Sequence, residues 1–96
     1  MSQYITIHSL TNSTAKYQTL STSGTQANSA AITARRIMIT TGNLAHHVQF
    51  NTSPWVTTAN GFCIPANTSM MFNFTTGDKV GVITVGASSM SILDLD

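Results

Sequence analysis

The sequence predicts a single all-β domain, a small antiparallel β-sandwich or jelly roll of about seven to eight short strands. Three observations predict this class. Short alternations of apolar and polar residues recur along the chain, turn-forming residues separate them, and no helical period is sustained. A chain of 96 residues can bury one modest core, so residues 1–96 are predicted to form one domain.

The amino-terminal third predicts two weak strands and a loop. Residues 4–10 alternate Ile5 and Ile7 with polar neighbours and predict a short strand. Residues 16–21 alternate poorly, which predicts an edge strand or an extended arm. Residues 21–29 are rich in Ser, Thr, Gly and Asn and predict a long loop, so residues 1–29 are expected to form a partly extended arm and loop.

The middle of the chain predicts two strands joined as a hairpin. Residues 30–41 place Ile37, Ile39 and Thr41 on one face, although alanines within residues 26–34 would also permit one helical turn. Gly42-Asn43 predicts a reversal. Residues 44–51 resume the alternation, with His46, Val48 and Phe50 on one side.

The carboxy-terminal half predicts a polar connection over residues 52–61, a strand at 62–64, a turn at 65–67 and a second hairpin. This hairpin joins alternating residues 70–74 and 80–83 through Thr-Thr-Gly-Asp. A closing strand follows at residues 90–95. The side chains expected inside the sandwich are Ile37, Ile39, Val48, Phe50, Phe72, Phe74, Val80 and Val82.

Charged residues make up only 7% of the chain, and the formal net charge is +1. Binding to nucleic acid needs several cations to neutralise phosphates, so no nucleic-acid partner is predicted. With little charge to keep copies apart, association into a homo-oligomer or a larger assembly is expected. The amino terminus lacks the features of a signal peptide and no segment has the length of a membrane span, which predicts no membrane partner and synthesis in a cytoplasm.

Arg35-Arg36 is the only basic cluster of the sequence. Adjacent strand residues point to opposite faces. One arginine is therefore expected to face solvent or a partner, and the other to lie at a sheet edge or pair with an aspartate. A solvated strand end is favoured over a functional basic patch.

The titratable residues predict no catalytic site, no metal and no cofactor, and therefore a protein that is not an enzyme. The chain contains three Asp, three His and no Glu. His46 and His47 would face opposite ways on a strand, so they are not expected to bind one ion together with His8 or Cys63. One of the two is expected in the core and the other at the surface. Cys63 is expected to be a small buried hydrophobe, because Phe62 and Ile64 flank it.

Trp55, beside Pro54 in the polar connection, has two interpretations. It could plug one end of the sandwich, which is favoured, or it could be exposed to a partner or a sugar ring.

Residues 36–96 carry an ordered set of segments: RIMITT at 36–41, HVQFNTSP at 47–54, IPANT at 64–68, FNF at 72–74, GDKV at 77–80 and SIL at 91–93. In this order they resemble a group of small all-β proteins that tailed bacteriophages encode among their virion structural genes. The resemblance implies a non-enzymatic structural protein of the virion, made in the host cytoplasm. A capsid decoration or cement protein is favoured, with the major capsid protein or other virion proteins as partners. The alternatives are a neck or tail adaptor and a carbohydrate- or receptor-binding module of a fibre.

For an interface of this kind, the candidate residues are large or basic side chains expected on the surface. The loop at residues 22–29 is a further candidate. The individual residues are Arg35, Arg36, Met38, Trp55 and Met71.

Overall fold

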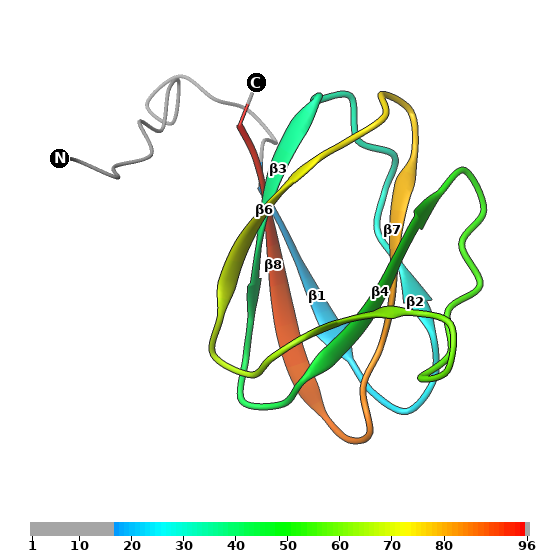
Figure 1. Ribbon diagram of the computed structural model, residues 1–96, viewed down its shortest axis with the longest axis vertical. Helices are drawn as coiled ribbons and strands as arrows, with labels where there is room; N and C mark the ends of the chain where they lie inside the picture. Colours follow the sequence, from blue (N-terminus) through cyan, green and yellow to red (C-terminus); the bar gives the residue numbers. More distant parts are fainter. Residues whose placement is uncertain (1–16, 96) are drawn as a thin grey trace, which may run out of the picture.

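The computed structural model describes residues 17–95, which form two antiparallel four-stranded sheets packed face to face (Figure 1). The first sheet has the strand order β1-β8-β3-β6 and the second β2-β7-β4-β5. The predicted all-β class is confirmed. The strands are β1 (Tyr17–Thr22), β2 (Ala27–Asn28), β3 (Arg36–Thr41), β4 (His46–Asn51), β5 (Phe62–Ile64), β6 (Ser69–Asn73), β7 (Lys79–Ile83) and β8 (Ser88–Asp94).

The core lies between the sheets, where alternate residues of each strand meet. Six of the eight predicted core residues are buried there: Ile37, Ile39, Val48, Phe74, Val80 and Val82. Phe50 and Phe72 are only partly buried and pack against the core from one open side. The buried side chains that the pattern did not single out include Ile32, Ile64, Met90 and Ile92.

Both predicted hairpins are wrong. β3 pairs with β6 and β8, whereas β4 pairs with β5 and β7, so residues 42–45 cross from one sheet to the other. Likewise β6 and β7 belong to different sheets. In a sandwich, the inner faces of both sheets are apolar and meet at one core. The alternation therefore identifies which side chains point inward, but it does not distinguish a hairpin from a crossing.

The connection that runs from β6 in the first sheet to β7 in the second is hydrogen-bonded to the connection between β2 and β3, which also passes from one sheet to the other. The backbone N–H of Gly77 donates to the carbonyl oxygen of Ile32 at 2.7 Å, and the N–H of Ile32 donates to Asp78 at 2.9 Å. Gly77 has a φ of 96°, a conformation that glycine adopts at little cost. The turn residue Gly77 was predicted correctly, but its turn joins two sheets.

The amino-terminal predictions have mixed outcomes. β1 is an edge strand of the first sheet, as expected from its poor alternation. The loop predicted at 21–29 includes β2, which pairs with β7. Residues 26–34 form no helical turn, and the strand predicted from residue 30 begins at Arg36. The strand predicted at residues 4–10 lies outside the described residues.

The later elements agree better with the sequence. The strands predicted at 62–64 and 90–95 correspond to β5 and β8. The turn before β6 contains Asn67, which has a φ of 52° and donates its N–H to the carbonyl oxygen of Gly42. Within residues 17–95, no helix has the length and apolarity needed to cross a membrane.

Candidate functional site

The loop at residues 52–61 lies on the outer face of the second sheet. Pro54 and Val56 are buried, although they belong to a connection rather than to a strand. Their partners are two glycines without side chains. A Cβ on Gly81 of β7 would lie 2.5 Å from Pro54 Cβ, and a Cβ on Gly61 would lie 2.7 Å from Val56 Cγ2. Glycine at position 81 therefore permits the loop to pack directly on the sheet. Gly61 is itself part of the loop, and its lack of a side chain leaves room for Val56 and for His47 of β4.

Polar side chains fix the backbone of this loop. Trp55 N–H donates to Gln49 Oε1 at 3.0 Å, and the carbonyl oxygen of Trp55 accepts from Asn60 Nδ2 at 3.2 Å. The next residue, Val56, donates its N–H to Gln26 Oε1 at 3.0 Å. The backbone at Trp55 is thus hydrogen-bonded on both its donor and its acceptor side.

Trp55 itself is 72% exposed. The prediction that it plugs the end of the sandwich is wrong, and the alternative interpretation, an exposed ring, is the observed one. The physical reason is the alternation of the loop, because Pro54 and Val56 point toward the sheet and the residue between them points away. Pro54 and Val56 are buried beneath the loop, and the loop presents its largest side chain, Trp55, to solvent.

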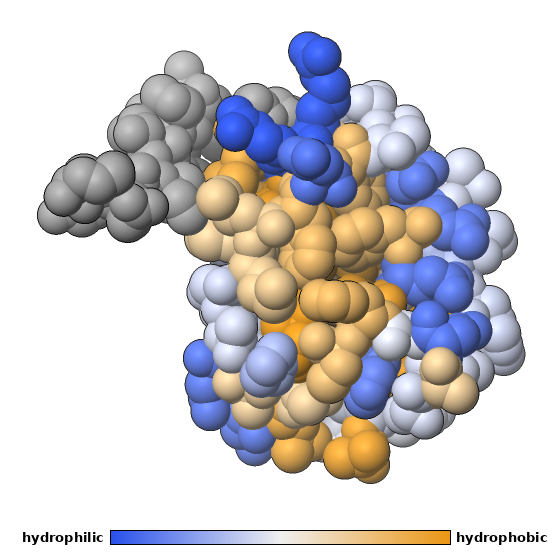
Figure 2. Space-filling view, viewed as in Figure 1, coloured by the Kyte–Doolittle hydropathy of each residue, from blue (hydrophilic) through white to orange (hydrophobic). Residues whose placement is uncertain are grey.

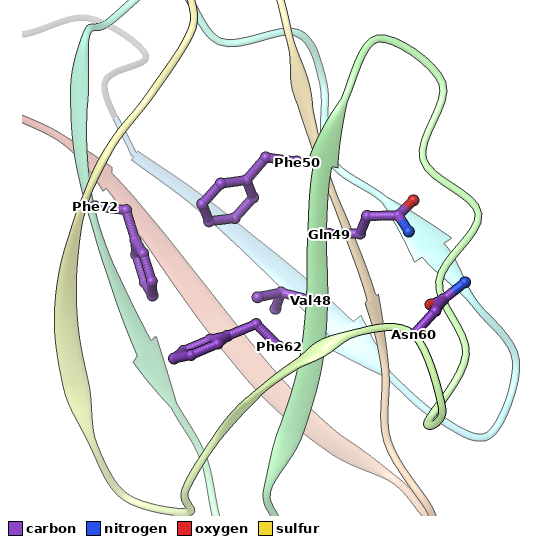
Figure 3. A pocket seen from close by; sticks show the side chains of 6 residues that line it. All are labelled: Val48, Gln49, Phe50, Asn60, Phe62 and Phe72. Atoms are coloured by element: carbon purple, nitrogen blue, oxygen red, sulfur yellow. The ribbon is translucent and has the colours of Figure 1, made fainter.

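A second surface is an apolar pocket of about 510 Å³ at the open side of the sandwich. In Figure 3 the rings of Phe50, Phe62 and Phe72 point into this opening from β4, β5 and β6. The centroid of Phe72 lies 5.1 Å from that of Phe50 and 5.9 Å from that of Phe62, both with edge-to-face geometry. Figure 2 shows apolar residues gathered in the middle of the same face, with hydrophilic residues around them.

A third surface is an apolar row on the outer face of the first sheet. Met38 of β3 lies between Leu93 of β8 and Met71 of β6, and Leu93 in turn lies opposite Tyr17 of β1. Tyr17 and Met71 are exposed at the two ends of the row. Two of the predicted interface residues, Met38 and Met71, are therefore neighbours, a pairing that no short-range pattern in the sequence predicts.

Arg35 precedes β3 and Arg36 begins it. Both arginines are exposed, as expected for a solvated strand end. The loop at 22–29 is mostly exposed, but it contains Thr22 and Ser29, which are buried. None of these residues lines the aromatic pocket.

The two adjacent histidines occupy different environments, as predicted. His46 is fully buried, whereas His47 is half-buried on the outer face of β4. Cys63 lies directly opposite His47 on β5 and is exposed, so its predicted burial is wrong. β5 is a short edge strand whose outward position carries the thiol, while Ile64 points into the core. The described residues contain no group of three or more His, Cys, Asp or Glu that could hold a metal ion.

Comparison with known proteins adds no relative to these observations. No family model, no curated protein and no solved structure matches the chain. The surfaces themselves, together with the sequence, are therefore the basis for a functional proposal.

Proposed function

We propose that this protein is a structural component of a bacteriophage particle, a decoration or cement subunit that binds the outer surface of the head and stabilises it. The order of segments in residues 36–96 supports the class of protein. The single structural observation that supports a binding role is Trp55, a large aromatic side chain exposed on a backbone that is hydrogen-bonded on both sides.

An exposed tryptophan on a fixed loop has the properties of an anchor residue, a side chain that contributes much of the binding free energy. Tryptophan is enriched among the residues that contribute most to protein–protein binding. Ordering a loop on binding costs conformational entropy, and this cost is reduced when the loop is already held in place. Gln49, Gln26 and Asn60 hold this one, so the free energy of burying the indole would go mainly into the contact.

The opposite side of the molecule supplies a second contact surface. On the outer face of the first sheet, Tyr17 and Met71 are exposed at the ends of the row. Met38 is half-buried between them, and Leu93 is buried. The Trp55 loop lies on the outer face of the second sheet. A subunit that joins a continuous layer needs at least two contact surfaces. Methionine side chains adapt to irregular partners, which suits a contact between subunits.

The second candidate is a carbohydrate- or receptor-binding module of a fibre. The exposure of Trp55 favours it, because an aromatic face can stack on a sugar ring. Recognition of sugar hydroxyls also needs polar groups beside the ring. The side-chain amide of Asn60, in the same loop, accepts from Thr57 N–H at 2.8 Å and donates to the carbonyl oxygen of Trp55. Its use within the loop favours a protein partner, and binding of the isolated protein to a glycan array would reverse this preference.

The position of the protein in purified particles tests the proposal directly. Cryo-electron microscopy of the phage particle whose genome encodes this protein should show one copy or one cluster of copies at every equivalent site of the head lattice. A few copies at a vertex or on the tail would instead indicate an adaptor or a fibre. Absence of the protein from purified particles would refute a structural role in the virion.

The role of Trp55 is tested with particles that lack the protein. Trp55→Ala should weaken rebinding to such heads by at least about 30-fold, the loss expected of an anchor residue. Val85→Ala is the matched control, because Val85 is 81% exposed but lies in the connection between β7 and β8. The free energy of unfolding of both variants should lie within about 0.5 kcal/mol of that of the natural chain. Equal affinity for Trp55→Ala and Val85→Ala would remove Trp55 from the contact.

A further inference from the structure

The open side of the sandwich is bounded by two edge strands. Within residues 17–95, β6 pairs only with β3 and β5 pairs only with β4. The edge of a sheet presents backbone N–H and C=O groups that can pair with another strand. Between these two edges lies the aromatic pocket, and Phe62 at its rim is 54% exposed.

The chemistry of the pocket defines what could fill it. The six lining side chains are Val48, Gln49, Phe50, Asn60, Phe62 and Phe72, none of them charged. An apolar cavity of about 150 Å³ accepts one benzene ring. A pocket of about 510 Å³ therefore has room for several aliphatic groups. An extended segment with aliphatic residues at alternate positions would fill the pocket and pair with an edge strand at the same time.

Residues 4–10 of this chain have the required pattern. The sequence Tyr-Ile-Thr-Ile-His-Ser-Leu contains no Asp, Glu, Lys or Arg. As a strand it would direct Ile5 and Ile7 to one face, because side chains alternate along a strand. Two isoleucines at this spacing match a pocket lined by phenylalanines, and Thr6 would point the other way.

The topology indicates which copy supplies the segment. The described chain begins at Tyr17 on β1, which lies at the opposite edge of the first sheet from β6. A strand added beyond β6 would lie four strand spacings from β1, about 19 Å. Residues 11–16 span at most about 22 Å when fully extended. Docking within one chain would stretch this linker across the sheet, whereas a segment from a neighbour is free of this constraint and can pair antiparallel, the more stable arrangement.

We propose that residues 4–10 of a second copy of this chain dock between β5 and β6, with Ile5 and Ile7 among Phe50, Phe62 and Phe72. The exchange makes the protein a dimer or a closed ring in solution. This proposal does not depend on the phage assignment, because both partners belong to this chain. They are the docking segment, residues 4–10, and its acceptor, the pocket between β5 and β6.

The first test compares two variants of the segment by sedimentation and light scattering. The natural chain should have at least twice the mass of one chain, which is 10.2 kDa. The double variant Ile5→Asp/Ile7→Asp should weaken association by at least about 100-fold, because it replaces two buried aliphatic side chains by carboxylates. Thr6→Asp, which adds a charge to the same segment on its other face, should leave the mass unchanged. An oligomer that persists in the double variant would overturn the proposal.

The second test is complementation between two chains. Phe62→Asp keeps the segment and damages the acceptor, while Ile5→Asp/Ile7→Asp keeps the acceptor and damages the segment. Each should be monomeric alone, and an equimolar mixture should form a mixed pair with one intact contact. Val85→Asp, at an exposed residue far along the chain from the pocket-lining residues, is the control for Phe62→Asp. Circular dichroism checks folding, and Phe62→Ser replaces the aspartate variant if that fails to fold.

A fluorescent dye for apolar surfaces distinguishes the two sources of the segment. A monomeric natural chain that binds little dye, but binds more in Ile5→Asp/Ile7→Asp, would show that the segment fills its own pocket. That result would overturn exchange between copies. If the natural chain is monomeric and binds as much dye as Ile5→Asp/Ile7→Asp does, docking of the segment is overturned altogether.

Discussion

At the scale of single residues, His46 is a buried imidazole with both ring nitrogens hydrogen-bonded. Nδ1 lies 2.7 Å from the carbonyl oxygen of Leu44, and Nε2 lies 3.0 Å from Thr22 Oγ1. A carbonyl oxygen only accepts, so Nδ1 must carry the hydrogen, and in the neutral ring Nε2 accepts from the Thr22 hydroxyl. Burial lowers the pKa of His46 below its ordinary value, although the hydrogen bond to Leu44 opposes this shift.

This environment predicts loss of stability in mild acid. Because the folded-state pKa of His46 is lowered, the unfolded chain binds more protons once the pH falls below about 6.5. The free energy of unfolding should therefore be highest above this pH and decrease as the pH falls toward the folded-state pKa. Urea unfolding between pH 5 and 8 measures it. His46→Gln should be less stable at pH 8 by about 1–3 kcal/mol, since Thr22 loses its partner, and should depend less on pH. Greater stability of the natural chain at pH 5 than at pH 8 would contradict this account.

Single residues were predictable from sequence only where the strand alternation decides their direction. Alternation correctly separated His46 from His47, because consecutive strand residues face opposite sides. It failed at Cys63, whose apolar neighbours indicated burial although β5 is a three-residue edge strand with an exposed outer side. Trp55 could not be placed, because its exposure follows from the burial of Pro54 and Val56 on either side of it. Pro54 packs against Gly81, which is distant in the sequence.

At the scale of elements, the strands were more predictable than their partners. The faces of β3 and β7 follow from alternation, since Ile37, Ile39, Val80 and Val82 are all buried. The pairing of β3 with β8 joins segments far apart in the sequence, and no local turn specifies it. The sequence therefore indicates an inward face for the strands that alternate clearly, whereas the assignment of strands to sheets arises from the packing of the whole domain.

The contact between β7 and the Trp55 loop predicts the effect of two glycine substitutions. In Gly81→Ala the new Cβ would lie 2.5 Å from Pro54 Cβ and 3.0 Å from Gln26 Oε1, so the loop must move away from the sheet. We expect a loss of about 1–3 kcal/mol in the free energy of unfolding, as for other overpacked sites. Gly86→Ala is the control, because its nearest atom is Leu44 Cδ1 at 3.6 Å. Denaturant unfolding compares them, and equal stability of the two variants would refute the tight contact.

At the scale of the whole molecule, the scarcity of charge limits how the protein can recognise a partner. The entire chain has four Lys and Arg and three Asp. Within residues 17–95, by contrast, the exposed aromatic and methionine side chains occupy three separate places: the Trp55 loop, the rim of the pocket at Phe62, and the row from Tyr17 to Met71. Recognition is therefore expected to depend on apolar burial and backbone pairing, with little electrostatic steering.

This balance predicts association that is insensitive to salt. Screening weakens contacts between exposed charges, but it leaves apolar burial almost unchanged. Between 50 and 500 mM NaCl, the dissociation constant for self-association or for the particle should change by less than about 3-fold. A polyanionic partner that engaged all four cations would instead lose up to about 10³-fold over this range. Arg35→Gln should bind like the natural chain at both salt concentrations, because an exposed arginine contributes little to an apolar contact. A steep salt dependence that Arg35→Gln reduces would show that the basic pair, and not the apolar surfaces, supplies the binding energy.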